Sequence, residues 1–279
     1  DGAVGSAGFL VEAFEYIKNS KSLTTTELIK LQTKTLYGAE KKTLAYIIGI
    51  MNMILHGIES PNIIHKNTLQ DNLFEIQNKD KVDVILANPP FGGKEKSQIL
   101  DNFPIKSKET AVLFLQHFFK KLKTFGRAAI IIKKTFLSID NKAFNEVRKE
   151  LVENFNLETI VYLPSSIFTG TPRETVVLFF TKGSKTEKIW YYEMKLNKTL
   201  GKRNPLKDTD LIDFEKKYKE KKISLNSWFV KYEELNKKNY QLISDNPKEP
   251  KEYVLRDQNK IVKLVKENND EIKKLFNSI

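Results

Sequence analysis

Short β-branched apolar runs alternate with longer amphipathic stretches over residues 1–180. This alternation is typical of an α/β fold with a mostly parallel sheet, because each connection is long enough to hold a helix. It predicts strands over Thr35–Gly38, Asn62–His65, Val82–Ala87, Arg127–Ile132, Leu157–Leu163 and Thr175–Thr181, with Ile189–Tyr192 as a further candidate. It predicts helices over Ala7–Asn19, Thr25–Gln32, Lys42–His56, Thr110–Thr124 and Lys142–Asn154, two of which end near glycine, at Gly57 and Gly126.

From about residue 194 the pattern becomes charged and punctuated by prolines and aromatic residues. A final helix rich in Lys, Glu and Leu is predicted over Tyr253–Asn277. Its apolar residues recur at roughly helical spacing, which indicates a helix that packs internally or binds a partner. The chain is therefore predicted to hold one large domain over residues 1–193 and a mainly helical C-terminal extension over residues 194–279.

Composition narrows the class of protein. With 279 residues, 40% of them hydrophobic, the chain can bury a sizeable core. No apolar run approaches the roughly 20 residues that span a bilayer, and no signal peptide opens the chain, so we expect a cytoplasmic protein. The chain has no cysteine and three scattered histidines, so metal catalysis is not expected. A net charge of +12 favours a polyanionic partner, although an AT-rich genome also enriches a chain in lysine.

Two segments carry residues that suit a nucleotide-like ligand. Asp1–Leu10 is a glycine-rich turn that leads directly into a helix, where small residues and unpaired N–H groups allow close approach to a ligand. Such loops are common, so this signal alone leaves the ligand open. Glu40 ends an apolar run and can accept hydrogen bonds from both ribose hydroxyls. Taken alone, Glu40 is better explained by the preference of carboxylates for helix N-termini.

The most specific segment is Asn88-Pro89-Pro90-Phe91, which follows the predicted strand Val82–Ala87. The two prolines fix φ and lack N–H donors, so this edge is rigid and its carbonyls stay available. An exocyclic amine has two N–H bonds, one for the Asn88 side-chain oxygen and one for the Pro89 carbonyl. Phe91 can stack on the ring that carries this amine. A turn that merely ends a buried strand would explain the prolines but not the whole order of residues.

Together these segments resemble the N6-adenine DNA methyltransferases, and in particular the modification subunits of type I restriction-modification systems. The resemblance covers nearly the whole chain. It is carried by Asp1–Leu10, Gly38-Ala39-Glu40, the helix through Met51–Gly57, Asn67-Thr68-Leu69, Asn88–Phe91, Gly126–Ala129, Leu163–Phe168, Thr175–Phe180, Asn204-Pro205-Leu206 and Ser227-Trp228-Phe229. It implies a Rossmann-like fold that binds S-adenosylmethionine, with helices flanking the sheet.

The resemblance also implies roles for individual residues. Ser6, Ala7 and Gly8 would contact the methionine end of the cofactor, Glu40 its ribose, and Asn67-Thr68-Leu69 its adenine. Asp1 and Gly5 complete the expected cofactor loop. The catalytic segment would be Asn88, Pro89, Pro90 and Phe91, with no metal. The amino group of an extruded adenine would attack the methyl carbon directly, without a dedicated general base.

The implied partners are DNA, a specificity subunit that reads the sequence, and a motor and restriction subunit, with two copies of this chain in each assembly. The chain departs from the family pattern at Gly2, Ala7 and Asn67, where the family usually has Pro, Gly and Asp. The methyl group of Ala7 is expected to crowd the cofactor or to require a disfavoured φ. We also expect a helical N-terminal domain and the first strand to precede Asp1.

Two alternatives remain open from the sequence. Enzymes that methylate a glutamine side chain in a protein use a similar Asn-Pro-Pro-aromatic segment, although Phe91 and the positive charge argue against this substrate. A truncated or degenerate subunit that supports assembly without turnover is the non-enzyme alternative.

Overall fold

A computed structural model describes residues 1–249, apart from 166, 169–173, 202 and 237–238, together with residue 268. Asp1–Asn246 form one unit and Pro247–Ile279 a second. The predicted helix Tyr253–Asn277 lies outside the described residues, except for Asn268.

The larger sheet of the first unit has six strands in the order β3-β4-β6-β5-β7-β8. Two of its pairs, β3 with β4 and β5 with β7, are parallel, and the other three are antiparallel. We expected a mostly parallel sheet. The difference arises because β6 runs antiparallel between β4 and β5, and β8 adds an antiparallel strand at the edge. The strands are β3 (Val82–Ala87), β4 (Leu122–Lys133), β5 (Phe155–Tyr162), β6 (Thr175–Lys182), β7 (Lys188–Glu193) and β8 (Ser227–Lys231).

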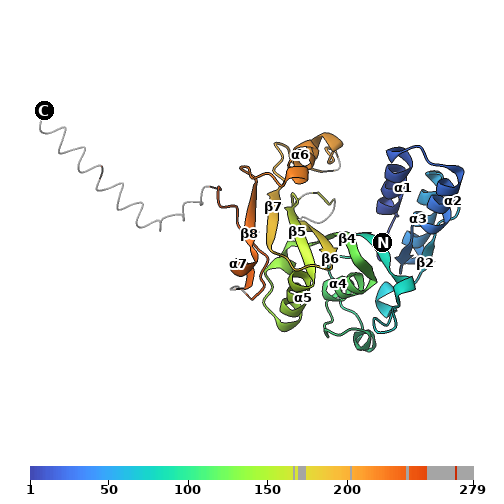
Figure 1. Cartoon of the computed structure of the whole chain (residues 1–279), viewed down its shortest axis with the longest axis horizontal. Coiled ribbons are helices and arrows are strands. Elements are labelled where there is room, and N and C mark those ends of the chain that lie inside the picture. The colour runs from blue at the N-terminus through green and yellow to red at the C-terminus, as the bar shows by residue number, and fades with distance from the viewer. Residues whose placement is uncertain (166, 169–173, 202, 237–238, 250–267, 269–279) are drawn as a thin grey trace, which may run out of the picture. The chain divides into compact units, whose positions relative to one another are not determined.

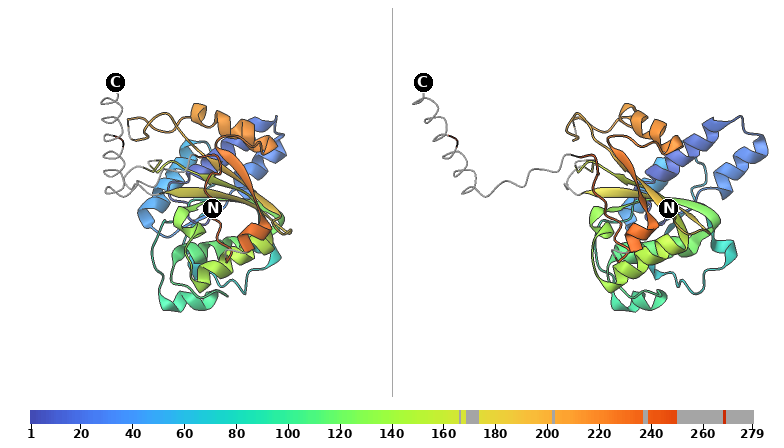
Figure 2. Two further views of the ribbon diagram at one scale, coloured as in Figure 1. Left: turned by 90° about the vertical axis from the view of Figure 1, so that its left-hand side faces the viewer. Right: turned by 60° about the vertical axis from the view of Figure 1, so that its left-hand side comes forward.

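Helices cover both faces of this sheet. Successive side chains of a strand point to opposite faces, and in this sheet the side chains on both faces are apolar. Ile189 and Tyr191 of β7 belong to the main core, and Trp190 and Tyr192 to a smaller core on the other face. The main core packs under α4 (Thr110–Lys121) and α5 (Lys142–Glu153), and the smaller one under α6 (Ile212–Glu220). The views of Figures 1 and 2 agree that α4 and α5 lie together on the side opposite α6.

A second, parallel pair of strands, β1 (Gly38–Glu40) and β2 (Ile63–His65), lies with α1 (Gly8–Ser20), α2 (Thr25–Lys34) and α3 (Thr43–Leu55) (Figure 1). These elements share their own apolar core, which includes Phe14 and Met53. The remaining elements are α7 (Tyr232–Asn236) and the short 3-10 turns η1 (Thr68–Gln70), η2 (Asn78–Asp80), η3 (Ser97–Asn102), η4 (Lys134–Leu137) and η5 (Asp208–Asp210).

Most predicted elements are present, with three instructive differences. The first predicted strand begins at Gly38 rather than Thr35, so Glu40 lies inside it. The helix predicted to Thr124 ends at Lys121, and Gly126 lies within β4 rather than after a helix. A Cβ at Gly126 would come within 3.0 Å of the Asp83 carbonyl, so the glycine serves the close approach of β3 and β4. The pattern after residue 194 did not predict β8.

Arg148 of α5 is fully buried and ties three segments together. Its guanidinium donates to the carbonyls of Phe136 at 2.7 Å, Ile139 at 2.9 Å and Tyr240 at 2.9 Å. Burial lowers the pKa of this group to about 10, so it stays charged at neutral pH. The Leu242 N–H also donates to Leu137 at 2.8 Å. Residues 240–242 are thus fastened to the turn that follows β4.

We expect Arg148→Met to lower the free energy of unfolding by about 3 kcal/mol, because three buried carbonyls lose a charged donor. Denaturant titration measures this change. Lys142→Ala is the control, since that side chain is 90% exposed on the same helix. A loss below about 1 kcal/mol for Arg148→Met would show that these bonds contribute little.

Candidate active site

The segment Asn88–Phe91 lies at the carboxyl end of β3, beside the carboxyl end of β4. Ala87 pairs with Ile130 in the sheet and is fully buried. The side-chain oxygen of Asn88 is buried and has no hydrogen-bond partner among the described residues. Burying an acceptor without a donor costs free energy, and a native structure with such an atom calls for an explanation. The position suits an amine donor that arrives with a ligand.

Between Asn88 and α4 the chain forms a long loop whose last residues lie against its first residues. Glu95 donates from its backbone to Lys108 at 3.0 Å, and Thr110 to Gly93 at 3.3 Å. These bonds bring the N-terminal turn of α4 beside the proline segment. The ring of Phe91 lies edge-on to Phe168, with 5.1 Å between ring centroids and 61° between ring planes. Phe168 comes from the connection between β5 and β6.

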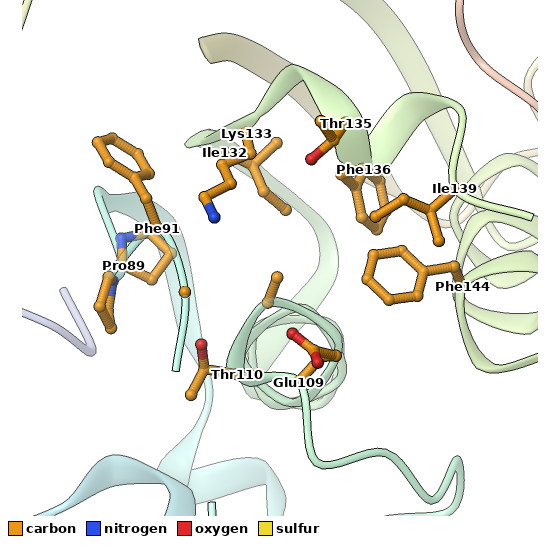
Figure 3. Close-up of a pocket in the computed structure, with 13 residues that line it drawn as sticks. Pro89, Phe91, Glu109, Thr110, Ile132, Lys133, Thr135, Phe136, Ile139 and Phe144 are labelled. Carbon is orange, nitrogen blue, oxygen red and sulfur yellow. The ribbon is translucent and has the colours of Figure 1, made fainter. Parts of the chain in front are cut away.

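A cavity of about 480 Å³ opens between the proline segment, the start of α4 and the turn after β4 (Figure 3). Its floor is apolar, and polar side chains from α4 and β4 border it. It is lined by Pro89, Pro90, Phe91, Gly92, Glu109, Thr110, Ala111, Ile132, Lys133, Thr135, Phe136, Ile139 and Phe144.

The glycine-rich loop lies beside β1 and carries unusual backbone angles. Gly5 has φ 57° and Ala7 has φ 63°, both in the left-handed region. For Gly5 this costs little, but for Ala7 the conformation is disfavoured by roughly 1 kcal/mol, as the sequence led us to expect. A Cβ added at Gly5 or Gly8 would meet no atom within 4 Å. The loop therefore leaves open space over these two glycines.

Glu40 holds the loop in place. One carboxylate oxygen accepts from the Gly5 N–H at 2.9 Å, and the other accepts from the Lys42 N–H at 2.9 Å. Each carboxylate oxygen can accept a second hydrogen bond. Glu40 can thus order the loop and still accept bonds from a sugar diol. The Ser6 carbonyl accepts from Asn52 of α3 at 2.8 Å, and the Asp1 carboxylate from the Ala3 N–H at 2.8 Å.

The segment Asn67-Thr68-Leu69 follows β2 and is turned mostly inward. Thr68 and Leu69 are buried, and the Thr68 hydroxyl donates to the Gly2 carbonyl at 2.6 Å. The Asn67 side chain accepts from the Leu69 N–H at 3.2 Å and stays partly exposed. Of these three side chains, Asn67 is therefore the one placed to meet a ligand at the surface.

The structure brings the predicted site residues into two connected groups. Asp1 to Gly8, Glu40 and Asn67 to Leu69 are joined by the hydrogen bonds given above. Asn88 to Phe91 form the second group. An ion pair of 3.1 Å between Lys41 and Glu95 links the residue after Glu40 to the loop after Phe91. The Ala3 side chain also packs against the main core, to which Ala87 belongs.

Sequence reasoning missed three residues of this region as site residues, namely Phe168, Thr110 and Lys133. Lys133 ends β4, which is parallel to β3, so the rule that site residues follow parallel strands would have found it. Thr110 and Phe168 are brought to the site by loop geometry that the sequence pattern does not reveal.

The family model described as N-6 DNA Methylase matches residues 1–254. The chain belongs to this N-6 DNA methylase family. The methylase subunit of the type I restriction enzyme EcoEI from Escherichia coli is 43% identical over 202 residues, which are 69% of this chain and 39% of that subunit. The methylase subunit of EcoKI from Escherichia coli strain K12 is 32% identical over 244 residues, or 79% of this chain and 44% of that subunit.

Among solved structures, a modification subunit of a putative type I restriction enzyme from Vibrio vulnificus YJ016 has a TM-score of 0.83 and 35% identity. The match covers 89% of this chain and 55% of that one. The predicted Rossmann-like methyltransferase fold is thereby confirmed. The chain spans less than half the length of the two curated relatives. In its described residues, no helix is both long and apolar enough to cross a membrane.

The inward-turned segment after β2 is anchored by a pair between buried His117 and partly buried Asp71. The His117 Nε2 lies 3.2 Å from Asp71, which also pairs with Lys66 at 2.7 Å. Burial alone would raise the pKa of Asp71, but hydrogen bonds from His117 and Lys66 outweigh it and lower the pKa to about 2. Burial lowers the pKa of His117 below its usual value. His117 is therefore neutral at pH 7 and donates from Nε2.

A histidine whose pKa is lowered by folding stabilises the fold less as pH falls, because the unfolded chain takes up the proton first, below about pH 6.5. We expect His117→Gln to lose less thermal stability than the wild type between pH 7.5 and pH 5.5. Melting curves at both pH values measure this difference. His56→Gln, at the exposed end of α3, is the control and should keep the wild-type dependence. Equal losses in His117→Gln and the wild type would contradict the prediction.

Proposed function

We propose that this chain transfers a methyl group from S-adenosylmethionine to the N6 amino group of adenine in DNA. Membership of the N-6 DNA methylase family supports the reaction class. The observation that carries the proposal for this chain is the buried, unpartnered side-chain oxygen of Asn88, fixed at the rigid edge formed by Pro89 and Pro90. An amino group offers the donor that this oxygen lacks.

Asn88 and Pro89 would act by holding the amine. One N–H bonds to the Asn88 side-chain oxygen and the other to the Pro89 carbonyl, which favours a pyramidal nitrogen with its lone pair aimed outward. The lone pair would form the new N–C bond to the methyl carbon while the C–S bond of the methyl donor breaks and its electron pair stays on sulfur. The extra N6 proton then leaves to water, since it becomes acidic only after transfer. Catalysis here is positioning and electrostatic stabilisation.

Phe91 would bind the face of the base. An adenine in a duplex must leave the base stack to reach Asn88, and an aromatic ring replaces part of the lost stacking. Phe91 is in edge-on contact with Phe168 in this structure. A base that enters between them would exchange this contact for stacking on both rings, so the pair is placed to hold the base from two sides.

The residues of the first group fit S-adenosylmethionine. Bound there, this cofactor would supply a methyl group activated by its positively charged sulfur. The open space over Gly5 and Gly8 accepts a ligand against the backbone. Glu40 keeps acceptor capacity for the two ribose hydroxyls, and Asn67 stays accessible beside it. The strained backbone of Ala7 and the buried side chains of Thr68 and Leu69 would shape this site rather than bind through polar groups.

The partners that we propose are DNA and the specificity and restriction subunits of a type I system, with two copies of this chain in each assembly. The type I methylase relatives support this proposal. We assign catalysis to residues 1–193 and assembly to the extension over residues 194–279. Residues 194–246 also contribute to the first unit, since β8 pairs with β7 and α6 covers one face of the sheet.

We expect Asn88→Ala to lower the rate of methyl transfer by about a hundredfold or more, because the amine loses its acceptor. The fold should stay intact, since removing an unpartnered buried oxygen leaves no group unsatisfied. Tritiated methyl transfer to adenine-containing DNA, with the specificity subunit present, measures the rate, and thermal melting checks the fold.

Asn78→Ala is the matched control for this experiment, because Asn78 is an exposed asparagine in η2. It should keep both the rate and the melting temperature. An Asn88→Ala enzyme that methylates DNA at nearly the wild-type rate would refute the role of Asn88.

Gly8→Ala is expected to weaken S-adenosylmethionine binding about tenfold without lowering the melting temperature. The new methyl group would occupy the open space in which we place the cofactor, and alanine is a better helix former than glycine. Calorimetric titration measures the binding. Gly201→Ala is the control, because a Cβ there also meets no atom within 4 Å. Wild-type affinity in Gly8→Ala would place the cofactor elsewhere.

A further inference from the structure

The cavity beside the proline segment contains polar groups to which the reaction described above gives no role. Thr110 reaches it from the start of α4 and Lys133 from the end of β4 (Figure 3). The inference drawn from them rests on the proposed function, because the cavity is bounded by the same Pro89 and Phe91 that would hold the target base.

Thr110 is only 5% exposed, yet its hydroxyl oxygen has no hydrogen-bond partner among the described residues. Leaving a buried hydroxyl unpaired costs free energy. In Figure 3 the hydroxyl points into the cavity rather than into the helix. Like the Asn88 side-chain oxygen, the Thr110 hydroxyl oxygen is a buried polar atom at this edge of the sheet without a hydrogen-bond partner among the described residues.

Lys133 is half-buried, and its ammonium group points into the same cavity between Pro89 and Thr110 (Figure 3). Within the described ranges it makes no hydrogen bond or ion pair. Its neighbour Lys134 has partners, since it pairs with Glu174 at 3.2 Å and lies over the Tyr162 ring. Lys133 therefore offers up to three N–H donors to whatever enters the cavity.

The chemistry of the walls selects the kind of ligand. Glu109 contributes a carboxylate to the cavity, which opposes a phosphate group. Ile132, Phe136, Ile139 and Phe144 make the floor apolar. A cavity that offers one cation, two threonine hydroxyls and one carboxylate beside apolar side chains fits a neutral heteroaromatic ring with both donors and acceptors. A nucleobase has this character.

We propose that Lys133 and Thr110 read the edge of the target base beside its amino group. In adenine the C6 amine lies between two ring nitrogens, N1 and N7, and both are acceptors. Asn88 and Pro89 hold the amine. At the same time the Lys133 ammonium donates to one of these ring nitrogens, and the Thr110 hydroxyl makes a second polar contact with the same edge of the base. Lys133 is thus a specificity-determining residue of this methylase.

The test uses the assembled enzyme and three DNA substrates that differ at the target base alone: adenine, 1-deazaadenine and 7-deazaadenine. Each analogue replaces one ring nitrogen by C–H and keeps the amine. The wild type should show kcat/KM about tenfold to a hundredfold lower on one of the two analogues than on adenine, as expected for a hydrogen bond to a charged donor. Lys133→Met should lose this discrimination and methylate the three substrates at similar rates.

Two further variants distinguish a role in base recognition from a general loss of stability or activity. Lys134→Met is the matched control, because it removes the same charge one residue away and should discriminate like the wild type. Thr110→Val keeps the shape of the side chain and should melt no lower than the wild type. Its KM for adenine DNA should rise several-fold with little change in kcat. A structural role for Thr110 would instead lower the melting temperature and leave KM unchanged.

The outcomes distinguish the inference from the proposed function. The inference is overturned if the wild type treats both analogues like adenine, or if Lys133→Met keeps the wild-type discrimination. Failure of the wild type to methylate adenine DNA at all would overturn the proposed function, and the inference with it.

Discussion

β3 ends at Ala87, and Pro89 and Pro90 follow it with fixed φ and without the N–H donors that a strand ladder uses. The rest of the site depends on this constraint. The next helix begins only at Thr110, so a long loop must leave the sheet and return to it. Its return places the start of α4 beside the prolines and encloses the cavity. The same constraint keeps the Asn88 oxygen buried and without a donor.

The loop that would bind the cofactor is ordered by a different means. The prolines after β3 restrict the backbone directly. At β1 the Glu40 carboxylate restricts it by accepting a hydrogen bond from Gly5, which fixes the glycine turn against the strand. The ion pair between Lys41 and Glu95 links this loop and β1 to the loop that follows Phe91. The methyl donor and the methyl acceptor would thus be held at the ends of β1 and β3, each fixed by contacts within the chain. This is the preorganisation that a direct displacement requires.

The sequence predicted those parts of the fold that local pattern determines. The strand Val82–Ala87 was placed correctly because an apolar run meets Asn-Pro-Pro, whose prolines lack the N–H donors of a strand ladder. The end of α4 was misplaced because Leu122 to Thr124 suit a helix locally, whereas pairing with β3 makes them strand. β8 was missed because its five residues lie in charged surroundings and become a strand only by pairing with β7.

The same limit applies to the site. Asn88 and Glu40 could be proposed from the sequence because each ends or follows a recognisable run of residues. The inward orientation of Thr68 and Leu69, and the approach of Thr110 and Lys133 to one cavity, depend on contacts between segments far apart in the chain. Hydrophobic pattern determines which face of an element is buried. It does not determine which side chains from different elements meet.

The bonds from Arg148 to Tyr240, and from Leu242 to Leu137, also bear on how the protein is made. Phe136 and Ile139, which line the cavity, are held by a guanidinium whose remaining backbone partner lies about a hundred residues later in the chain. A ribosome delivers residues in order, at about 5–20 per second. The cofactor loop and the proline segment can therefore form early during synthesis. The part of the cavity formed by Phe136 and Ile139 gains the hydrogen bonds from residues 240–242 only when these residues have left the ribosome.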